Sequence, residues 1–236
     1  MCGRFTLIRL SDFTDMFPWI RPPQQQPPPS PRYNIAPTQP IAAVRNNPEP
    51  QIEFLNWGLI PSWAKDPAIG NRMINARAES MDKKPAFRTA LRRRRCVIPA
   101  SGFFEWKKLG RQRVPMYVTA ASARPLGLAG LWDVWHDDAG SQVTSCTIIT
   151  VPSNELVRPI HDRMPAILRE SDYRLWLDPA EQPPEKLLPA LGPYPAGEMR
   201  MQEVSRAANN AKIDSPQCIE PASAPAGKKP QQGVLF

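Results

Sequence analysis

Short apolar stretches, each followed by a turn, restrict the fold of this chain more than any other feature of its sequence. After RYNIAPTQPIAAV come IEFLNWGLIP, MINARAES, CVIPASGFFEW, MYVTAA, LGLAGLWDVW and SCTIITVP. β-branched and aromatic residues are frequent in these stretches, and one stretch closely follows another. This pattern is typical of antiparallel strands, and it predicts an antiparallel sheet system as the core.

Helical segments are fewer and shorter. Four are predicted, at residues 11–17, 84–94, 170–178 and 183–191. We expect Ser11 to cap the first, and the second places Phe87 and Leu91 four residues apart on one helical face. The predicted fold class is therefore α+β, a sheet-dominated single domain with an antiparallel β core and peripheral helices.

Proline sets the expected limits of this domain, because 30 of the 236 residues are proline. Residues 21–31, RPPQQQPPPSP, predict an extended, mobile loop of low complexity. From Pro221 the composition changes to proline, alanine, glycine and lysine, which predicts a disordered tail. We therefore expect one domain over residues 1–220 and a tail over residues 221–236.

The last six residues, QQGVLF, are not typical of such a tail. They resemble the short Gln-x-x-Leu-Phe peptide that bacterial sliding clamps bind in a hydrophobic pocket. Gln232, Leu235 and Phe236 would make the contacts, and the flexible tether would give them reach. The alternative is a hydrophobic chain end without a role.

The overall charge favours an anionic partner. Lysine and arginine exceed aspartate and glutamate by eight, which gives an isoelectric point near 9.6. Such a surplus suits nucleic acid, although basic proteins without such a partner are common. No apolar run approaches the roughly 18–20 residues that span a bilayer, and the N-terminus lacks the apolar region of a signal peptide. We expect a cytoplasmic protein that does not bind membranes.

The cysteines and histidines limit the metal chemistry that the chain could carry. Cysteines at positions 2, 96, 146 and 218 form no C-x-x-C pair, and the only histidines are His136 and His161. This set predicts reduced thiols, no metal site and no cofactor.

Cys2 is the first candidate for chemistry. A small second residue allows removal of Met1, which leaves Cys2 with a free α-amine beside its thiol. The reference pKa of the amine is about 7.7–8.0 and that of the thiol about 8.5, so both have reactive fractions near neutral pH. With an aldehyde the amine forms an imine, and the thiol then closes a five-membered thiazolidine. Position alone leaves open the alternative of an ordinary terminal residue.

Two further candidates are ionisable. His161, in HDRMP, follows the strand-like TIITVPSNE and is a predicted general acid or base, whereas His136 is predicted to be solvated in a polar turn. Glu105 lies between Phe104 and Trp106. Its carboxylate is either solvated or buried with a raised pKa, and strand alternation favours the solvated face.

Polar and basic residues supply the remaining candidates. Asn75, Arg77 and Glu79 share one face of a predicted strand, where Asn75 could orient a hydroxyl and Arg77 a phosphate. A polar outer face is the alternative. The run Arg92–Arg95, with tryptophans such as Trp63 elsewhere, suits single-stranded nucleic acid, but a solvated helix end is the commoner reason for such a run.

In order along the chain, six motifs resemble the SOS response-associated peptidase (SRAP) family, which includes bacterial and eukaryotic proteins that shield abasic sites. They are MCGRFTL, RYNIAPTQ, WGLIPSWAKD, NARAES, KPAFRTALRRRRCVIPASGFFEWKK and HDRMPAIL. The resemblance covers residues 1–208, and every motif position compared is present.

The resemblance implies a site. Cys2 would form a thiazolidine with the ring-opened sugar of an abasic site, and Asn75 would hold the aminothiol and the sugar. Glu105 would assist ring opening and imine formation, and His161 would act as acid or base at the sugar oxygen.

It also implies partners. Arg4, Arg77 and Arg163 would bind phosphates that flank the lesion, Trp63 would contact the DNA, and Pro40 would wedge against a base pair. The substrate would be single-stranded DNA, including its junctions with duplex. The chain would be a bacterial, nucleoid-associated monomer.

Three other readings of these residues remain open. A cysteine peptidase, including one that removes residue 1 or releases itself from DNA, would use Cys2, Glu105 and His161. A glutamine amidotransferase with an N-terminal nucleophile also begins Met-Cys-Gly, and a non-catalytic module for single-stranded DNA would explain the charge alone. An imine that fails to close would also give strand cleavage, so lyase activity is a predicted side reaction.

Overall fold

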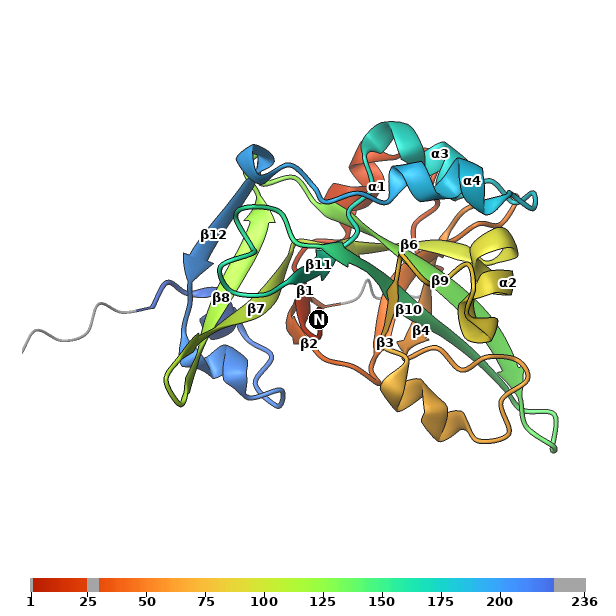
Figure 1. Ribbon diagram of the computed structural model, residues 1–236, viewed down its shortest axis with the longest axis horizontal. Helices are drawn as coiled ribbons and strands as arrows, with labels where there is room; N and C mark the ends of the chain where they lie inside the picture. Colours follow the sequence, from red (N-terminus) through yellow and green to blue (C-terminus); the bar gives the residue numbers. More distant parts are fainter. Residues whose placement is uncertain (1, 25–29, 223–236) are drawn as a thin grey trace, which may run out of the picture.

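Two β-sheets make up most of the protein, and short helices cover one end of them (Figure 1). The computed structural model describes residues 2–24 and 30–222. The strands are β1 (Phe5–Leu7), β2 (Arg32–Ile35), β3 (Pro40–Arg45), β4 (Ile52–Trp57), β5 (Asn75–Arg77), β6 (Arg95–Ala100), β7 (Gly102–Leu109), β8 (Gln112–Ala120), β9 (Leu126–His136), β10 (Gln142–Pro152), β11 (Arg163–Pro165) and β12 (Met199–Glu203). The sheet-dominated α+β fold is therefore confirmed.

The first sheet has five strands in the order β12-β8-β7-β1-β2. All its pairings are antiparallel. Strand β1 is an inner strand, because β2 pairs along one of its edges and β7 along the other. The N-terminal segment is thus held by backbone hydrogen bonds on both sides.

The second sheet closes into a small barrel. Its order is β11-β10-β4-β3-β6-β9, and β9 pairs again with β10 to complete the ring. Strand β10 runs parallel to β4 and to β5. The prediction of an antiparallel core is wrong at these pairings, because β4 and β5 are joined to β10 through long connections rather than hairpins.

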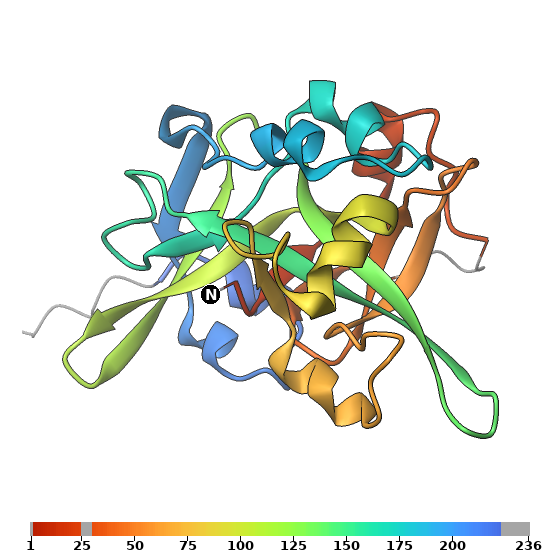
Figure 2. The same ribbon diagram turned by 45° about the vertical axis from the view of Figure 1, so that its right-hand side comes forward.

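Helices cover the barrel but contribute little to the site. They are α1 (Ser11–Met16), α2 (Pro85–Arg93), α3 (Tyr173–Trp176) and α4 (Pro184–Leu187), with short 3-10 segments η1 (Pro67–Arg72), η2 (Glu170–Asp172), η3 (Leu188–Ala190), η4 (Ala196–Glu198), η5 (Arg206–Asn209) and η6 (Pro216–Ile219). Both views place α1, α3 and α4 together at one end and α2 against the barrel (Figures 1 and 2). Helix α1 is joined to α3 by the stacked rings of Phe17 and Tyr173, 4.4 Å apart.

The predicted cap of α1 is wrong. Leu10 occupies the N-cap position, and no side chain accepts a hydrogen bond there. Leu10 already has helical backbone angles, with φ −69° and ψ −30°. Ser11 therefore lies inside the first turn, where its hydroxyl is not in the capping position.

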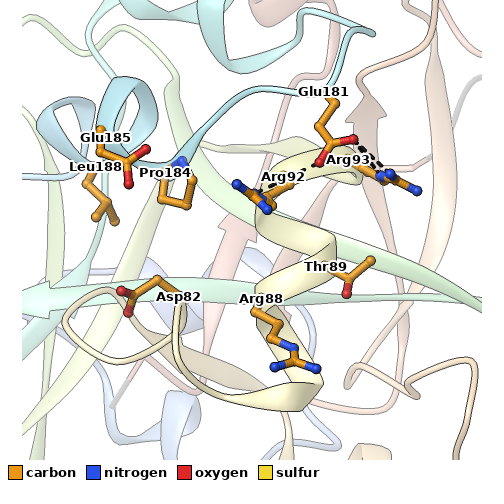
Figure 3. A pocket seen from close by; sticks show the side chains of 9 residues that line it. All are labelled: Asp82, Arg88, Thr89, Arg92, Arg93, Glu181, Pro184, Glu185 and Leu188. Carbon is orange, nitrogen blue, oxygen red and sulfur yellow. Dashed lines mark hydrogen bonds and ion pairs between the residues drawn. The ribbon is translucent and has the colours of Figure 1, made fainter.

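The arginine run divides between surface and interior. Arg92 and Arg93, at the end of α2, both lie near the carboxylate of Glu181, and all three line a hollow of about 630 Å³ (Figure 3). Arg94 forms an ion pair with Asp133, with 2.9 Å between Nη1 and Oδ1. This part of the run fits the interpretation as a helix end rather than a nucleic-acid site, because carboxylates already lie against its cations.

Arg95 is fully buried, which the sequence pattern did not predict. Its guanidinium donates hydrogen bonds to the carbonyl oxygens of residues 91, 92, 176, 178 and 180. These carbonyls belong to the ends of α2 and α3 and to the loop that follows, where a cation is electrostatically favoured.

Arg95→Met is expected to destabilise the protein by about 3 kcal/mol or more, because it leaves several buried carbonyls without donors. Urea unfolding followed by tryptophan fluorescence would measure this loss. The matched control is Arg92→Met, whose side chain is 52% exposed, and which should cost no more than about 0.5 kcal/mol. Equal costs for the two variants would contradict the structural role of Arg95.

Candidate active site

Cys2 lies three residues before β1, and its side chain is fully buried. In both views β1 lies where the two sheets meet (Figures 1 and 2). Phe5 pairs with Phe103, and the amide of Phe104 donates to the carbonyl of Arg4 over 2.9 Å. Continuing this register places Cys2 alongside the next residues of β7, which include Glu105.

Glu105 is buried, with 3% of its surface exposed. The prediction that it lies on a solvated face is wrong, because Phe103, Phe104 and Glu105 are all buried and β7 thus has no solvated face at this point. Burial raises the pKa of Glu105 to about 7, and the carboxylate of Asp162 adds to the rise. The carboxyl group therefore changes charge near neutral pH, as a general acid or base requires.

The Cys2 thiol is affected in the same direction. Burial raises the pKa of this thiol well above its ordinary value, and the negative charge of Glu105 raises it further. Cys2 is therefore a neutral thiol at physiological pH. A sulfur atom in this state needs a nearby base when it attacks an electrophile, and Glu105 is near enough to affect its ionisation.

The raised pKa of Glu105 also bears on stability. A carboxyl group with a raised pKa in the folded protein binds its proton more tightly there than in the unfolded chain, so its ionisation opposes folding. This penalty begins near the unfolded-state pKa of about 4.3 and is complete above the folded-state value of about 7.

Glu105→Gln is therefore expected to unfold at higher urea concentration than wild type at pH 8, with a smaller or no difference at pH 5. The difference in unfolding free energy between variant and wild type should change by at most about 3 kcal/mol from pH 5 to pH 8, as the size of the pKa shift requires. Glu53→Gln, at a partly exposed glutamate paired with Arg45, is the control. A difference in stability that does not vary with pH would contradict a buried, ionisable Glu105.

His161 lies in the turn before β11, and one hydrogen bond determines which tautomer its neutral ring adopts. The backbone amide of Arg163 donates to Nδ1 of His161 over 3.0 Å. The neutral ring therefore carries its proton on Nε2, which makes this atom a hydrogen-bond donor. Burial lowers the pKa of His161, so this neutral form predominates near pH 7. His136, by contrast, lies exposed at the end of β9, as predicted.

Glu105 and His161 line one cavity of about 650 Å³. Its other lining residues are Trp106, Lys108, Arg113, Pro159, Ile160 and Asp162. One wall comes from the β7–β8 hairpin and the other from the turn before β11. The cavity thus brings together a carboxyl group and an imidazole, and Glu105 couples it electrostatically to the Cys2 thiol.

Asn75 begins β5, which pairs with β10 beside this region. Its side-chain amide donates to the carbonyl oxygen of Ile74 over 2.9 Å and, more weakly, to that of Ile148 over 3.4 Å. Its Oδ1 atom is buried and accepts no hydrogen bond from the described residues. An acceptor in this state is available to a donor such as an amine or a hydroxyl.

Two of the predicted phosphate-binding arginines already have partners. Arg163 forms a bidentate ion pair with Glu79, at 2.6 and 3.0 Å, and also donates to the carbonyl of Thr150. Arg4 donates to Oδ1 of Asn34 at 2.7 Å and to the carbonyl of Ala208 at 3.1 Å.

The other predicted DNA contacts lie exposed on separate parts of the surface. Arg77 is exposed on β5. Trp63 is 59% exposed above a hollow that also contains Lys65 and Arg72. Pro40 is exposed at the start of β3. Neither Trp63 nor Pro40 lines the Glu105–His161 cavity.

Glycine determines the chain path toward Trp63. Gly58 ends β4 with a φ of +137°, and a Cβ atom there would lie 2.6 Å from the carbonyl oxygen of Gly70. Only glycine fits this close approach. After the turn that it allows, Leu59 and Ile60 are buried, and the segment reaches the exposed Trp63.

Three lining residues were missed as candidates: Lys108, Arg113 and Asp162. Lys108 and Arg113 stand in WKKLGRQR, where Gly110 marks the turn of a hairpin, so a tight turn between basic residues was the available signal. Asp162 is the neighbour of His161 in HDRMP.

The chain thus combines a small α+β fold with a buried cysteine at residue 2, which is coupled electrostatically to a cavity that holds a carboxyl group and a histidine. The model of the SOS response associated peptidase (SRAP) family matches residues 1–211, and the chain belongs to this family.

Relatives agree with this assignment, and a solved structure shows the same fold. The chain is 43% identical to abasic site processing protein YoqW of Bacillus subtilis, over 93% of this chain and 99% of that protein. It is 30% identical to abasic site processing protein HMCES of Mus musculus, over 98% of this chain and 79% of that protein. A crystal structure of a Bacteroides thetaiotaomicron protein has the same fold, with a TM-score of 0.84 at 24% identity, covering 94% of this chain and all of that one.

Within the described ranges, no helix is long and apolar enough to cross a membrane. All four cysteines are buried free thiols.

Proposed function

We propose that this protein processes abasic sites in single-stranded DNA by linking Cys2 covalently to the open-chain sugar. The coupling of the Cys2 thiol to a cavity that holds Glu105 and His161 is the observation that carries this proposal. Two relatives named for abasic site processing cover nearly the whole chain and support the same substrate.

The first steps open the sugar and join it to the protein. The ionised Glu105 accepts the proton of the C1′ hydroxyl, His161 donates its Nε2 proton to the ring oxygen, and the bond from C1′ to this oxygen breaks to give the aldehyde. Glu105 then returns its proton to Nε2 of His161, so both residues regain their starting states. After Met1 is removed, the α-amine of Cys2 adds to the aldehyde carbon. The aldehyde oxygen then leaves as one molecule of water, and an imine remains. The buried Oδ1 of Asn75 is available to hold the amine or a sugar hydroxyl during these steps.

The last step closes the ring. Sulfur of Cys2 attacks the imine carbon, Glu105 accepts the thiol proton, and the former imine nitrogen is protonated. Glu105 suits this role because its pKa of about 7 leaves much of it ionised at neutral pH. The thiazolidine has no imine to promote β-elimination, so the strand is shielded from breakage.

Mass spectrometry tests this chemistry directly. Protein incubated with single-stranded DNA that carries one abasic site should give an adduct that survives denaturation. Its mass should equal that of the chain without Met1 plus the DNA, less one water. DNA with a tetrahydrofuran analogue, which has no aldehyde, should give none. No adduct, or an adduct that retains Met1, would refute the proposal.

Two side activities follow from the same residues. An imine that does not close would allow β-elimination, which gives a low level of lyase activity. The Cys2 thiol, with Glu105 and His161, would also serve a peptidase function such as removal of residue 1 or self-release from DNA. Two alternatives are not favoured. Family membership does not support a glutamine amidotransferase, and a non-catalytic DNA-binding module would not need the cavity that holds Glu105 and His161.

The DNA contacts are part of this proposal. Arg77 would meet a phosphate directly. Arg163 and Arg4 would do so only while they also keep their hydrogen bonds to Glu79 and Asn34, respectively. Trp63 offers an exposed ring on which a base can stack. Pro40 would lie against the first base pair where the strand enters duplex.

The sequence suggests where the protein acts. Gln232, Leu235 and Phe236 lie outside the described residues, which end at residue 222. We propose that they dock on a bacterial sliding clamp, from a monomeric, cytoplasmic protein associated with the nucleoid. Titration of the clamp with a peptide of the last ten residues tests the docking, and no binding at about 100 μM would refute it.

A further inference from the structure

The β7–β8 hairpin carries an arrangement that the proposed chemistry does not use. Lys108 and Arg113 are directly opposite each other in its antiparallel ladder, one pair before the turn. Two like charges in this position destabilise the pairing of the strands. Both residues also line the cavity that contains Glu105 and His161.

No carboxylate among residues 2–24 and 30–222 forms an ion pair with either side chain. Other arginines around the site differ in this respect, since Arg163 pairs with Glu79 and Arg32 with Asp214. Within the described protein, no ion pair therefore offsets the repulsion between Lys108 and Arg113.

We propose that Lys108 and Arg113 together bind one phosphate of the captured DNA strand at the rim of the cavity. Two cations side by side suit the paired oxygens of a phosphodiester, and Arg can donate two parallel hydrogen bonds to it. The proposal rests on the proposed function, and it names the part of the substrate that the hairpin recognises. It also sets the path of the DNA strand, which would run between Lys108 and Arg113 on the first sheet and Arg77 on the second.

A carboxylate on the opposite wall of the cavity restricts where this phosphate can lie. Asp162 lines the same cavity, its side chain is 84% exposed, and its carboxylate repels an anion. The phosphate therefore belongs on the hairpin side. The Lys108 ammonium also affects the chemistry, because it adds to the lowering of the His161 pKa that burial begins. A phosphate bound to Lys108 would weaken that effect, so occupancy of this position raises the pKa of His161.

Paired double variants test the phosphate site. Lys108→Ala/Arg113→Ala removes the proposed pair, and Lys107→Ala/Arg111→Ala removes the same charge from exposed residues of the same hairpin that do not line the cavity. Binding is measured on single-stranded DNA with a tetrahydrofuran analogue, which cannot be linked. The first variant should weaken binding by about tenfold. It should also lower by about 1 the steepness with which the logarithm of the binding constant falls with the logarithm of the salt concentration. The control should change both quantities much less. Equal effects of the two variants would overturn the proposal.

A neutral phosphate locates the contact. A single methylphosphonate, moved through the linkages on either side of the analogue, should weaken wild-type binding several-fold at one linkage. At that linkage Lys108→Ala/Arg113→Ala should be insensitive, and a sensitivity equal to wild type would overturn the assignment. Absence of adduct in the wild type would instead count against the proposed function and leave the binding result standing.

Discussion

Cys2→Ala is expected to lower the yield of denaturation-resistant adduct by at least about 100-fold, because the bond from sulfur to the sugar can no longer form. The alanine still presents an α-amine once Met1 is removed. This amine can form an imine, and the imine promotes β-elimination. The variant should therefore break abasic DNA faster than wild type does, while it binds the tetrahydrofuran analogue with unchanged affinity.

The control for this variant is Cys218→Ala. Cys218 is buried like Cys2, but it lies in a separate small hydrophobic cluster with Phe104 and Tyr117. Denaturing gels would follow adduct and strand breakage in the same samples, and borohydride would trap the imine. An undiminished heat-stable adduct in Cys2→Ala, or its equal loss in Cys218→Ala, would contradict the assigned role of the N-terminal thiol.

Glu105→Gln is expected to slow thiazolidine closure by about 100-fold at pH 7.5, since it removes a positioned general base. The wild-type rate should rise with pH as the carboxyl group ionises, through the pKa of about 7, and then level off. The variant lacks this group, so the ratio of the two rates should be small at pH 5.5 and reach its full value above pH 8. Taking the ratio removes the pH dependence of the amine and of the sugar itself.

Single-turnover adduct formation at saturating DNA would measure these rates. Glu53→Gln again provides the control, because Glu53 pairs with Arg45 on β3 and does not line the cavity. A rate ratio that is constant from pH 5.5 to pH 8 would exclude Glu105 as the titrating base. Weaker binding of the tetrahydrofuran analogue by Glu105→Gln would point instead to a structural role.

Local patterns predicted the strands well because the residues that favour them are close together in the chain. Closure of the barrel depends instead on pairings between distant segments. The parallel alignment of β10 with β5, for instance, joins Ile148 to Asn75. No turn signal connects such residues, so the parallel pairings could not be predicted.

The candidate site had the same limits. Cys2, Asn75, Glu105 and His161 could be selected by residue type and by resemblance, and the structure couples Cys2 to Glu105 and places Glu105 and His161 in one cavity. The burial of Glu105 could not be predicted, because strand alternation describes one strand and cannot reveal what covers both of its faces. The ion pair between Arg163 and Glu79 was hidden for a similar reason, since 84 residues separate them.

The inner position of β1 bears on how a finished adduct would be cleared. DNA linked to Cys2 would be tied to a strand that is hydrogen-bonded on both edges, by β2 and by β7. A motor protein that pulls on the DNA would apply its force directly to β1. Because β1 is paired on both edges, the protein would unfold as a unit rather than lose its N-terminal segment first. Each molecule would serve once, and its removal would require the extraction of β1 and with it the unravelling of the first sheet.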